Sequence, residues 1–97
     1  MRKILTFFIL LIITSAALAQ VNTNRFMAMG RSDLFNDNYT ESIKNLTIVI
    51  KATPNKFEPY FFRGLAKYSL GDFEGAINDF DKSIKINPYF SYNYQYA

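Results

Sequence analysis

The sequence predicts an all-α fold, a solenoid of antiparallel helix pairs with two full repeats and the start of a third. From residue 20 onward the chain repeats itself with a period of 34 residues, and a period of this size is typical of stacked helical repeats. Within each unit, apolar residues recur every three or four positions, the spacing of one helical face. Each unit also ends at a proline, Pro54 or Pro88, and proline stops helices.

Residues 1–19 have the features of a secretory signal peptide. Arg2 and Lys3 give a basic start, an apolar run follows, and Ala17 and Ala19 form a small-residue cleavage site. The apolar run is shorter than the roughly twenty residues of a transmembrane helix. We therefore expect export to the periplasm, cell envelope or extracellular space, with cleavage and no stable membrane span afterwards. The alternative is a membrane anchor formed by an uncleaved signal.

The charge of the chain argues against binding to nucleic acids. The formal net charge is +3, but without Arg2 and Lys3 nine cations face eight acids, which leaves +1. The remaining cations are scattered singly along the sequence, whereas nucleic-acid-binding proteins carry a clustered basic surface. The absence of cysteine excludes disulfides and lipid attachment through an N-terminal cysteine.

The 34-residue register matches small residues with small ones and apolar residues with apolar ones. The matched pairs are Gly30 with Gly64, Leu34 with Tyr68, Tyr39 with Phe73, Ser42 with Ala76, Ile43 with Ile77, Leu46 with Phe80, and Pro54 with Pro88. The prolines coincide without a gap. Two units that preserve a glycine, a proline and the apolar pattern together indicate a true repeat.

The second unit predicts two short helices. Pro59 suits the first turn of a helix, which continues through an apolar segment to Leu70. Gly71 and Asp72 then predict a turn, with the aspartate as the cap of the next helix. That helix begins at Phe73.

The first unit follows the same plan with a different turn. Asn36, Asp37 and Asn38 stand where the second unit has its glycine turn. A second helix from Tyr39 then carries an apolar stripe, and Pro54 ends the unit.

Residues 57–88 resemble a tetratricopeptide repeat, and residues 23–56 resemble a second, more divergent one. Residues 20–22 are then a short N-terminal segment, the second unit extends to residue 90, and residues 91–97 begin an incomplete third repeat. The positions that match the packing pattern of the family are Phe26, Gly30, Tyr39, Ser42, Leu46, Pro54, Tyr60, Gly64, Phe73, Ala76, Phe80 and Pro88.

The resemblance implies a right-handed solenoid whose first helices line a concave groove for a peptide or a partner helix. The expected function is a non-enzymatic protein-interaction scaffold with a protein or peptide partner and no cofactor. The candidate groove residues are Met27, Arg31, Leu34, Phe35, Phe61, Leu65, Tyr68 and Ser69. Many family members bind a C-terminal carboxylate through lysine and asparagine on these faces. Those residue types are missing at the matching positions, so we do not extend that activity to this chain.

The aromatic segment after Pro88 supports a second interpretation. Five of the nine residues from Tyr89 to Ala97 are aromatic, whereas the last unit of a repeat array normally has a polar outer face. The chain is therefore either a structural terminal segment of a longer solenoid with no dedicated ligand, or a fragment that self-associates through this end.

Enzymatic chemistry has little support in the sequence. There is no histidine or cysteine, which removes the imidazole base and the thiolate nucleophile. The acid pairs Asp72/Glu74 and Asp79/Asp81 are two residues apart, and such neighbours on a helix do not face each other. We therefore expect no catalytic, cofactor or metal site.

Two expectations concern single residues. Arg63 stands where the family often has leucine, and we hypothesise that it pairs with Asp79 across the helix hairpin. Gly75 lies inside the second helix, where glycine costs roughly 1 kcal/mol relative to alanine. Gly75→Ala is therefore expected to be stabilising.

Overall fold

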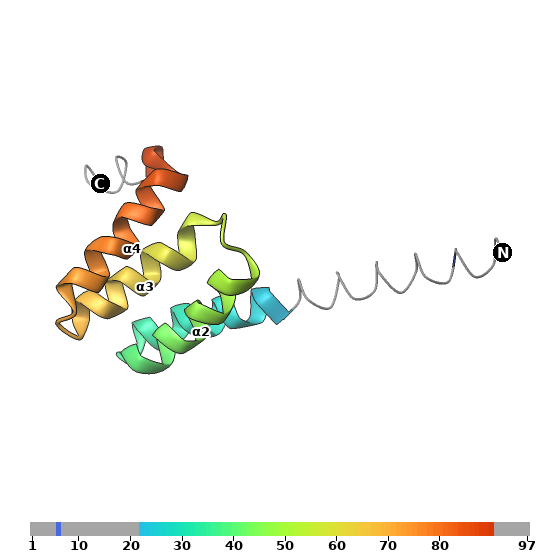
Figure 1. Ribbon diagram of the computed structural model, residues 1–97. Helices are drawn as coiled ribbons and strands as arrows, with labels where there is room; N and C mark the ends of the chain where they lie inside the picture. The colour runs from blue at the N-terminus through green and yellow to red at the C-terminus, as the bar shows by residue number, and fades with distance from the viewer. Residues whose placement is uncertain (1–5, 7–21, 91–97) are drawn as a thin grey trace.

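The computed structural model describes Thr6 and residues 22–90, and these residues are almost entirely helical (Figure 1). A first helix covers residues 22–35. It is followed by α2 (Tyr39–Ala52), α3 (Phe57–Ser69) and α4 (Phe73–Ile86). A helical turn at residues 88–90 comes after α4. Successive helices pack as pairs, which confirms the predicted all-α solenoid fold.

The helix α3 lies at the centre of the packing. It contacts both α2 and α4, whereas α2 and α4 do not contact each other to a comparable extent. Figure 1 shows α3 between the other two labelled helices. The core is small, and its buried apolar side chains are Leu46, Val49, Tyr60, Ala66 and Ala76.

Glycines sit where the two helices of each repeat cross. A Cβ atom added to Gly30 would lie 2.7 Å from the side chain of Leu46, and one added to Gly64 would lie 2.6 Å from the ring of Phe80. Both distances are shorter than real contacts of a Cβ atom, so each crossing requires a residue that has no side chain. The two repeats therefore use the same close approach, with a large apolar residue of the second helix against the glycine.

The turn within each repeat requires a left-handed backbone at the same register position. Gly71 has a φ of +86°, and its counterpart Asp37 has a φ of 62°. Glycine adopts this conformation without a steric cost, whereas aspartate tolerates it less well. Asp72 then caps α4, as predicted, by accepting a hydrogen bond from the Gly75 N–H at 3.0 Å.

The cap also explains Gly75 and changes the expectation made from the sequence. A Cβ atom on Gly75 would collide with the carboxylate of Asp72, whose Cγ would be 2.8 Å away. A side chain at position 75 therefore requires the capping carboxylate of Asp72 to shift from its present position. The stabilisation expected for Gly75→Ala does not take this contact into account.

The remaining boundaries lie close to the predicted ones. Pro59 is in the first turn of α3, which begins two residues earlier at Phe57. Asn87 ends α4, and its side chain accepts a hydrogen bond from the Phe90 N–H at 3.2 Å. The predicted signal peptide, except for Thr6, and the predicted third-repeat segment at residues 91–97 lie outside the described residues.

Candidate functional site

A polar network joins α3, the first helix of the second repeat, to its neighbours α2 and α4. It thereby helps to position the surface that the first helices of the two repeats form. Arg63 donates two hydrogen bonds to the Asp79 carboxylate, from Nε at 2.8 Å and from Nη2 at 2.7 Å. Lys67 lies on the same carboxylate, with Nζ 3.1 Å from Oδ2. Asp79 is only 4% exposed. The hypothesised pairing of Arg63 with Asp79 is confirmed, and the paired geometry satisfies a charge that would be costly to bury alone.

The same arginine reaches across the repeat boundary. Its Nη1 donates to Oγ1 of Thr47 on α2 at 3.2 Å. The Thr47 hydroxyl in turn donates to the carbonyl of Ile43 at 2.6 Å. Arg63 therefore ties α3 to α4 within its own repeat and to α2 of the preceding one.

At the start of α2, the hydroxyl of Tyr39 bonds within its own repeat and lies near a side chain of the next one. The Tyr39 hydroxyl donates to the Asp37 carboxylate at 2.9 Å. This hydrogen bond raises the pKa of the Tyr39 hydroxyl above its ordinary value of 10.0, and the hydroxyl of Ser69 acts in the opposite direction. The start of α2 thus lies beside the end of α3, so the two helices run antiparallel.

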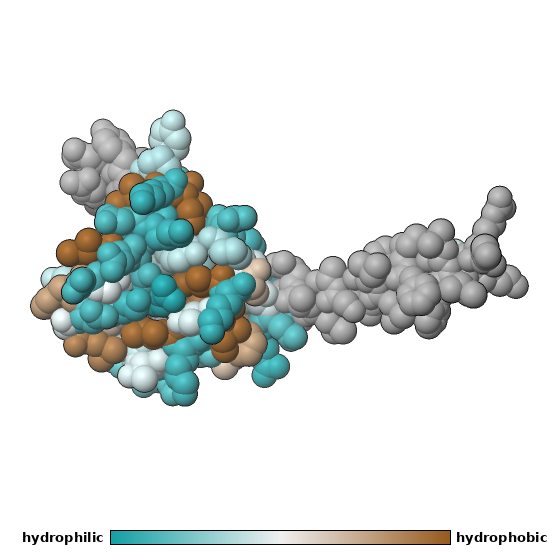
Figure 2. Space-filling view, in the orientation of Figure 1, coloured by the Kyte–Doolittle hydropathy of each residue, from teal (hydrophilic) through white to brown (hydrophobic). Residues whose placement is uncertain are grey.

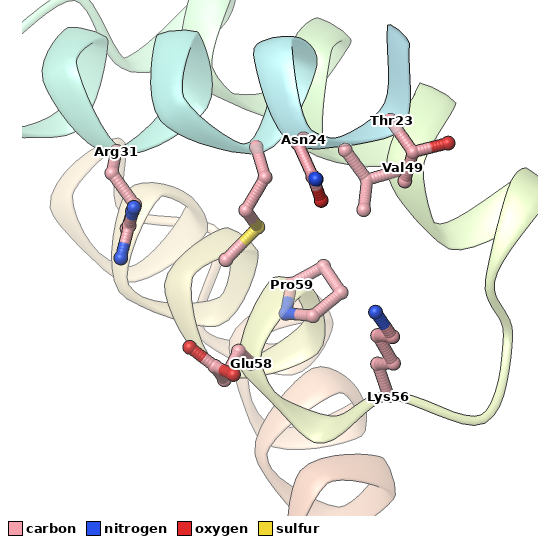
Figure 3. Close-up of a pocket in the computed structure, with 8 residues that line it drawn as sticks. Thr23, Asn24, Arg31, Val49, Lys56, Glu58 and Pro59 are labelled. Carbon is pink, nitrogen blue, oxygen red and sulfur yellow. The ribbon is translucent and has the colours of Figure 1, made fainter. Parts of the chain in front are cut away.

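A pocket opens between the first helix and the start of α3. It has a volume of about 150 Å³ and is lined by Thr23, Asn24, Met27, Arg31, Val49, Lys56, Glu58 and Pro59. Figure 3 shows Asn24 and Arg31 extending from the first helix toward Pro59 and Glu58. Its lining combines three apolar residues, Met27, Val49 and Pro59, with five polar or charged ones, of which two are cations and one is an acid. Among the described residues, the structure records no ion pair for Arg31, Lys56 or Glu58 within 4.0 Å.

The structure brings only two of the predicted groove residues into this pocket, Met27 and Arg31. Phe61 is half-buried among aromatic rings, with centroids 6.0 Å from Phe80 and 5.2 Å from Phe90. Tyr68 is exposed and stacks edge-on against Phe73 at 5.2 Å. The surface formed by the first helices of the two repeats therefore has two separate features. One is the pocket, and the other is an aromatic cluster of Phe61, Phe80 and Phe90.

The other predicted groove residues lie outside both features. Leu34 and Leu65 are half-buried, and Phe35 is 78% exposed. Ser69 is exposed and donates to the Leu65 carbonyl at 2.9 Å. These four residues are not among those that line the pocket with Met27 and Arg31.

Half of the twelve predicted packing residues are buried. Gly30, Ser42, Leu46, Tyr60, Gly64 and Ala76 are buried, and Phe26, Tyr39 and Phe80 are half-buried. Pro54 and Pro88 are exposed in the turns. Phe73 differs from its counterpart Tyr39, since it is 56% exposed. The reason is that α3 covers α2, whereas no described helix covers the corresponding face of α4.

Sequence reasoning missed six pocket residues: Thr23, Asn24, Val49, Lys56, Glu58 and Pro59. Most of them lie at the ends of helices, where a search restricted to one helical face does not look. The repeat boundary at residues 56 and 57 could have indicated these residues. In a stack of repeats, the start of one repeat lies beside the start of the next, so residues from both starts can line one pocket.

The described residues form no group of three or more histidine, cysteine, aspartate or glutamate side chains that could hold a metal ion. Within the same part of the chain, no helix has both the length and the apolar character needed to cross a membrane. Figure 2 shows hydrophobic side chains in separate patches among hydrophilic ones on the face in view.

A comparison with models of protein families gives a match in the second unit. Residues 57–90 match the family model of the tetratricopeptide repeat. The match shows that this segment, about a third of the chain, is similar to a tetratricopeptide repeat. It coincides with the predicted bounds of the second repeat and contains α3, α4 and the aromatic cluster. Tetratricopeptide repeats generally mediate protein–protein interactions and are typically not enzymes.

Proposed function

We propose that the protein is a non-enzymatic scaffold that binds a peptide or a partner helix on the surface of its first helices. One observation carries the proposal: Met27 and Arg31 share a pocket of about 150 Å³ with Glu58 and Pro59 at the start of α3. The pocket therefore lies between the first helices of two successive repeats. Its volume is smaller than that of a typical small-molecule site, so it suits a single side chain of a peptide or partner helix.

The test compares variants of the pocket with a variant of the same helix outside it. The wild-type chain, the Met27→Ala/Arg31→Ala double variant and Met29→Ala are used as bait in an extract of the source organism, with chemical crosslinking. Met29 is exposed on the first helix but does not line the pocket. We expect one or more proteins to crosslink to the wild type and to Met29→Ala, and to be lost from the double variant at equal helicity. A partner that the double variant retains would contradict the groove as the binding site.

A second candidate function is a structural segment of a longer solenoid or a self-associating repeat unit. It is favoured by the exposed face of α4, where Phe73, Ile77 and Ile84 are 56%, 58% and 42% exposed. Their counterparts Tyr39, Ile43 and Ile50 are half-buried, on a helix that packs against α3. The face of α4 is therefore suited to another helix.

Oligomeric state distinguishes this candidate from the first. If α4 mediates self-association, Ile77→Asp should convert an oligomer to a monomer in light scattering, and removal of residues 89–97 should not. If the aromatic end mediates it, the deletion should dissolve the oligomer and Ile77→Asp should not. A wild-type chain that is monomeric at high concentration would exclude self-association.

We also propose that the protein is exported and that residues 1–19 are removed. Support comes from the basic start, the short apolar run and the Ala17/Ala19 site in the sequence. Intact mass measurement of the protein from its native source should give a chain beginning at Gln20. A mass that includes residues 1–19 would support the uncleaved anchor instead.

A further inference from the structure

The pocket has a counterpart one repeat later, and the two differ in what fills them. In the 34-residue register, four residues of the pocket, Thr23, Met27, Val49 and Lys56, correspond to Phe57, Phe61, Ser83 and Phe90, in that order. The counterparts of Glu58 and Pro59 lie outside the described residues. The first four residues line the open pocket. Three of the four counterparts are aromatic. The second repeat therefore shows how an aromatic residue packs at a register position that is occupied by a lysine, Lys56, in the first repeat.

At the second position, the ring of Phe90 occupies the space between the two first-helix residues. Its centroid is 4.7 Å from that of Phe57 and 5.2 Å from that of Phe61, in an edge-on arrangement with Phe61. The hydrogen bond from the Phe90 N–H to the Asn87 side chain, at 3.2 Å, helps to fix the backbone there. Such pairs of rings are favourable beyond the area that they bury.

The open pocket matches an aromatic ring in size. Its volume is about 150 Å³, and an apolar protein cavity of about 150 Å³ is known to bind benzene. In chain order, the floor is formed by Met27, Val49 and Pro59. Methionine sulfur makes favourable contacts with aromatic rings, so Met27 suits the same occupant.

The charges at the pocket also favour a ring. Arg31 and Lys56 are exposed cations that line it, and cations within about 6 Å of a ring centroid attract its face. The protein already contains this interaction, since the Arg63 guanidinium lies 5.9 Å from the ring centroid of Tyr60. Lys56 stands at the register position of Phe90, so its flexible side chain borders the space that Phe90 fills in the next repeat.

We propose that the pocket between the first helix and α3 binds an aromatic side chain, phenylalanine or tyrosine, of a protein partner. The proposal rests on the proposed groove function and names the chemistry of the anchor residue. In the second repeat, Phe90 stands at the register position of Lys56 and packs its ring against Phe57 and Phe61, which is the arrangement that the partner's ring would reproduce in the pocket.

The experiment uses small probes and NMR of the 97-residue chain. N-acetyl-phenylalanine amide, N-acetyl-leucine amide and N-acetyl-aspartate amide are titrated separately, and the methyl signals of Met27 and Val49 are followed. The phenylalanine probe should give saturable upfield shifts at both methyls with one-to-one stoichiometry, at least tenfold tighter than the other two probes. Equal or tighter binding of the leucine or aspartate probe would overturn the proposal and indicate an aliphatic or acidic anchor.

A variant that copies the second repeat provides the second test. Lys56→Phe should place a ring in the pocket, and binding of the phenylalanine probe should weaken at least tenfold while helicity is retained. Lys51→Phe, an exposed position outside the pocket, should bind the probe as the wild type does. If Lys56→Phe and the wild type bind equally, the ring does not occupy this pocket.

The reverse variant tests the comparison without depending on the first pocket. Phe90→Lys should open the second position and add a second set of probe-induced shifts at Phe57 and Phe61. The absence of a second site, with the helical circular dichroism unchanged, would show that Phe90 does not fill an equivalent pocket.

The outcomes separate this inference from the proposed function. A partner that is lost from Met27→Ala/Arg31→Ala but retained by Lys56→Phe would leave the groove function intact and reject the aromatic anchor. The opposite result is also possible: the phenylalanine probe binds specifically, but no partner depends on Met27 and Arg31. This result would reject the groove function, and it would still support the preference of the pocket for an aromatic ring.

Discussion

The two repeats share their packing positions but differ in how they satisfy the polar groups between their helices. In the second repeat, Asp79 of α4 accepts from Arg63 and Lys67 of α3. In the first, the counterpart Asn45 donates from Nδ2 to the Asp33 carboxylate of the first helix at 2.8 Å. The carboxylate thus lies on the second helix in the second repeat and on the first helix in the first repeat. Its partners are two cations in the second repeat and the amide of Asn45 in the first.

The first repeat adds a buried hydrogen bond that the second lacks. The hydroxyl of Ser42 donates to the carbonyl of Gly30 at 2.7 Å, directly at the helix crossing. At the same crossing in the second repeat, Ala76 faces Gly64 without a hydroxyl. The crossing geometry is therefore constrained by size, whereas the polar contacts that accompany it are free to vary.

The largest expected difference between the repeats concerns these polar networks. Asp79→Ala should lower the free energy of unfolding by about 3 kcal/mol, because it leaves Arg63 and Lys67 without their anion in a largely buried site. Asn45→Ala should cost about 1 kcal/mol, the value of a typical hydrogen bond. Urea denaturation followed by circular dichroism measures both. Equal losses would show that the ion pair contributes no more than the amide.

The next effect concerns the helix crossings. Gly64→Ala and Gly30→Ala should each be destabilising by about 2 kcal/mol, since forcing extra atoms into a packed site costs about 1–3 kcal/mol. Gly64→Ala should cost more if the ring of Phe80 yields less readily than the side chain of Leu46. Thermal unfolding gives the comparison. An increase in stability for either variant would mean that the crossing has room for a methyl group.

The turns should respond to substitution with opposite signs. Gly71→Ala should be destabilising by about 1 kcal/mol, because alanine resists the left-handed backbone at this position. Asp37→Gly should be stabilising by a smaller amount, since glycine relieves the same strain while the exposed hydrogen bond to Tyr39 is lost. If both variants are less stable than the wild type, the Asp37–Tyr39 contact outweighs the backbone strain.

The smallest effect is expected at the start of α4. Gly75→Ala gains about 1 kcal/mol of helix propensity and loses a cap worth about 1 kcal/mol, so its net effect should be within about 0.5 kcal/mol. In the first repeat, Glu41 occupies this position and the cap residue Asn38 makes no side-chain cap bond. Asp72→Ala is the matched control, because it removes the cap alone. A gain of a full 1 kcal/mol for Gly75→Ala would show that the cap survives the added methyl group.

The sequence was sufficient for features that depend on local chemistry and on the repeat. The period placed the helices and the prolines, and the resemblance to the tetratricopeptide repeat identified Gly30 and Gly64 as packing positions. The pairing of Arg63 with Asp79 was hypothesised from one unusual residue. The sequence was insufficient where side chains from different repeats meet. Phe61 was expected in the groove, yet it packs on Phe80 and Phe90, because two other rings lie within its reach. Lys56 and Glu58 line the pocket only because the turn before α3 returns the chain beside the first helix.

The hydrogen bond from Arg63 to Thr47 has a consequence for unfolding. In repeat proteins, stability is approximately a sum of the stability of each unit and of the contacts between neighbours. Arg63 belongs to both kinds of contact, since it binds Asp79 within its own unit and Thr47 in the preceding one. When the second unit opens, α2 loses a partner at the same moment. Arg63 therefore adds to the packing of α3 on α2 that couples the two units, so that they tend to melt as one cooperative transition and not as two.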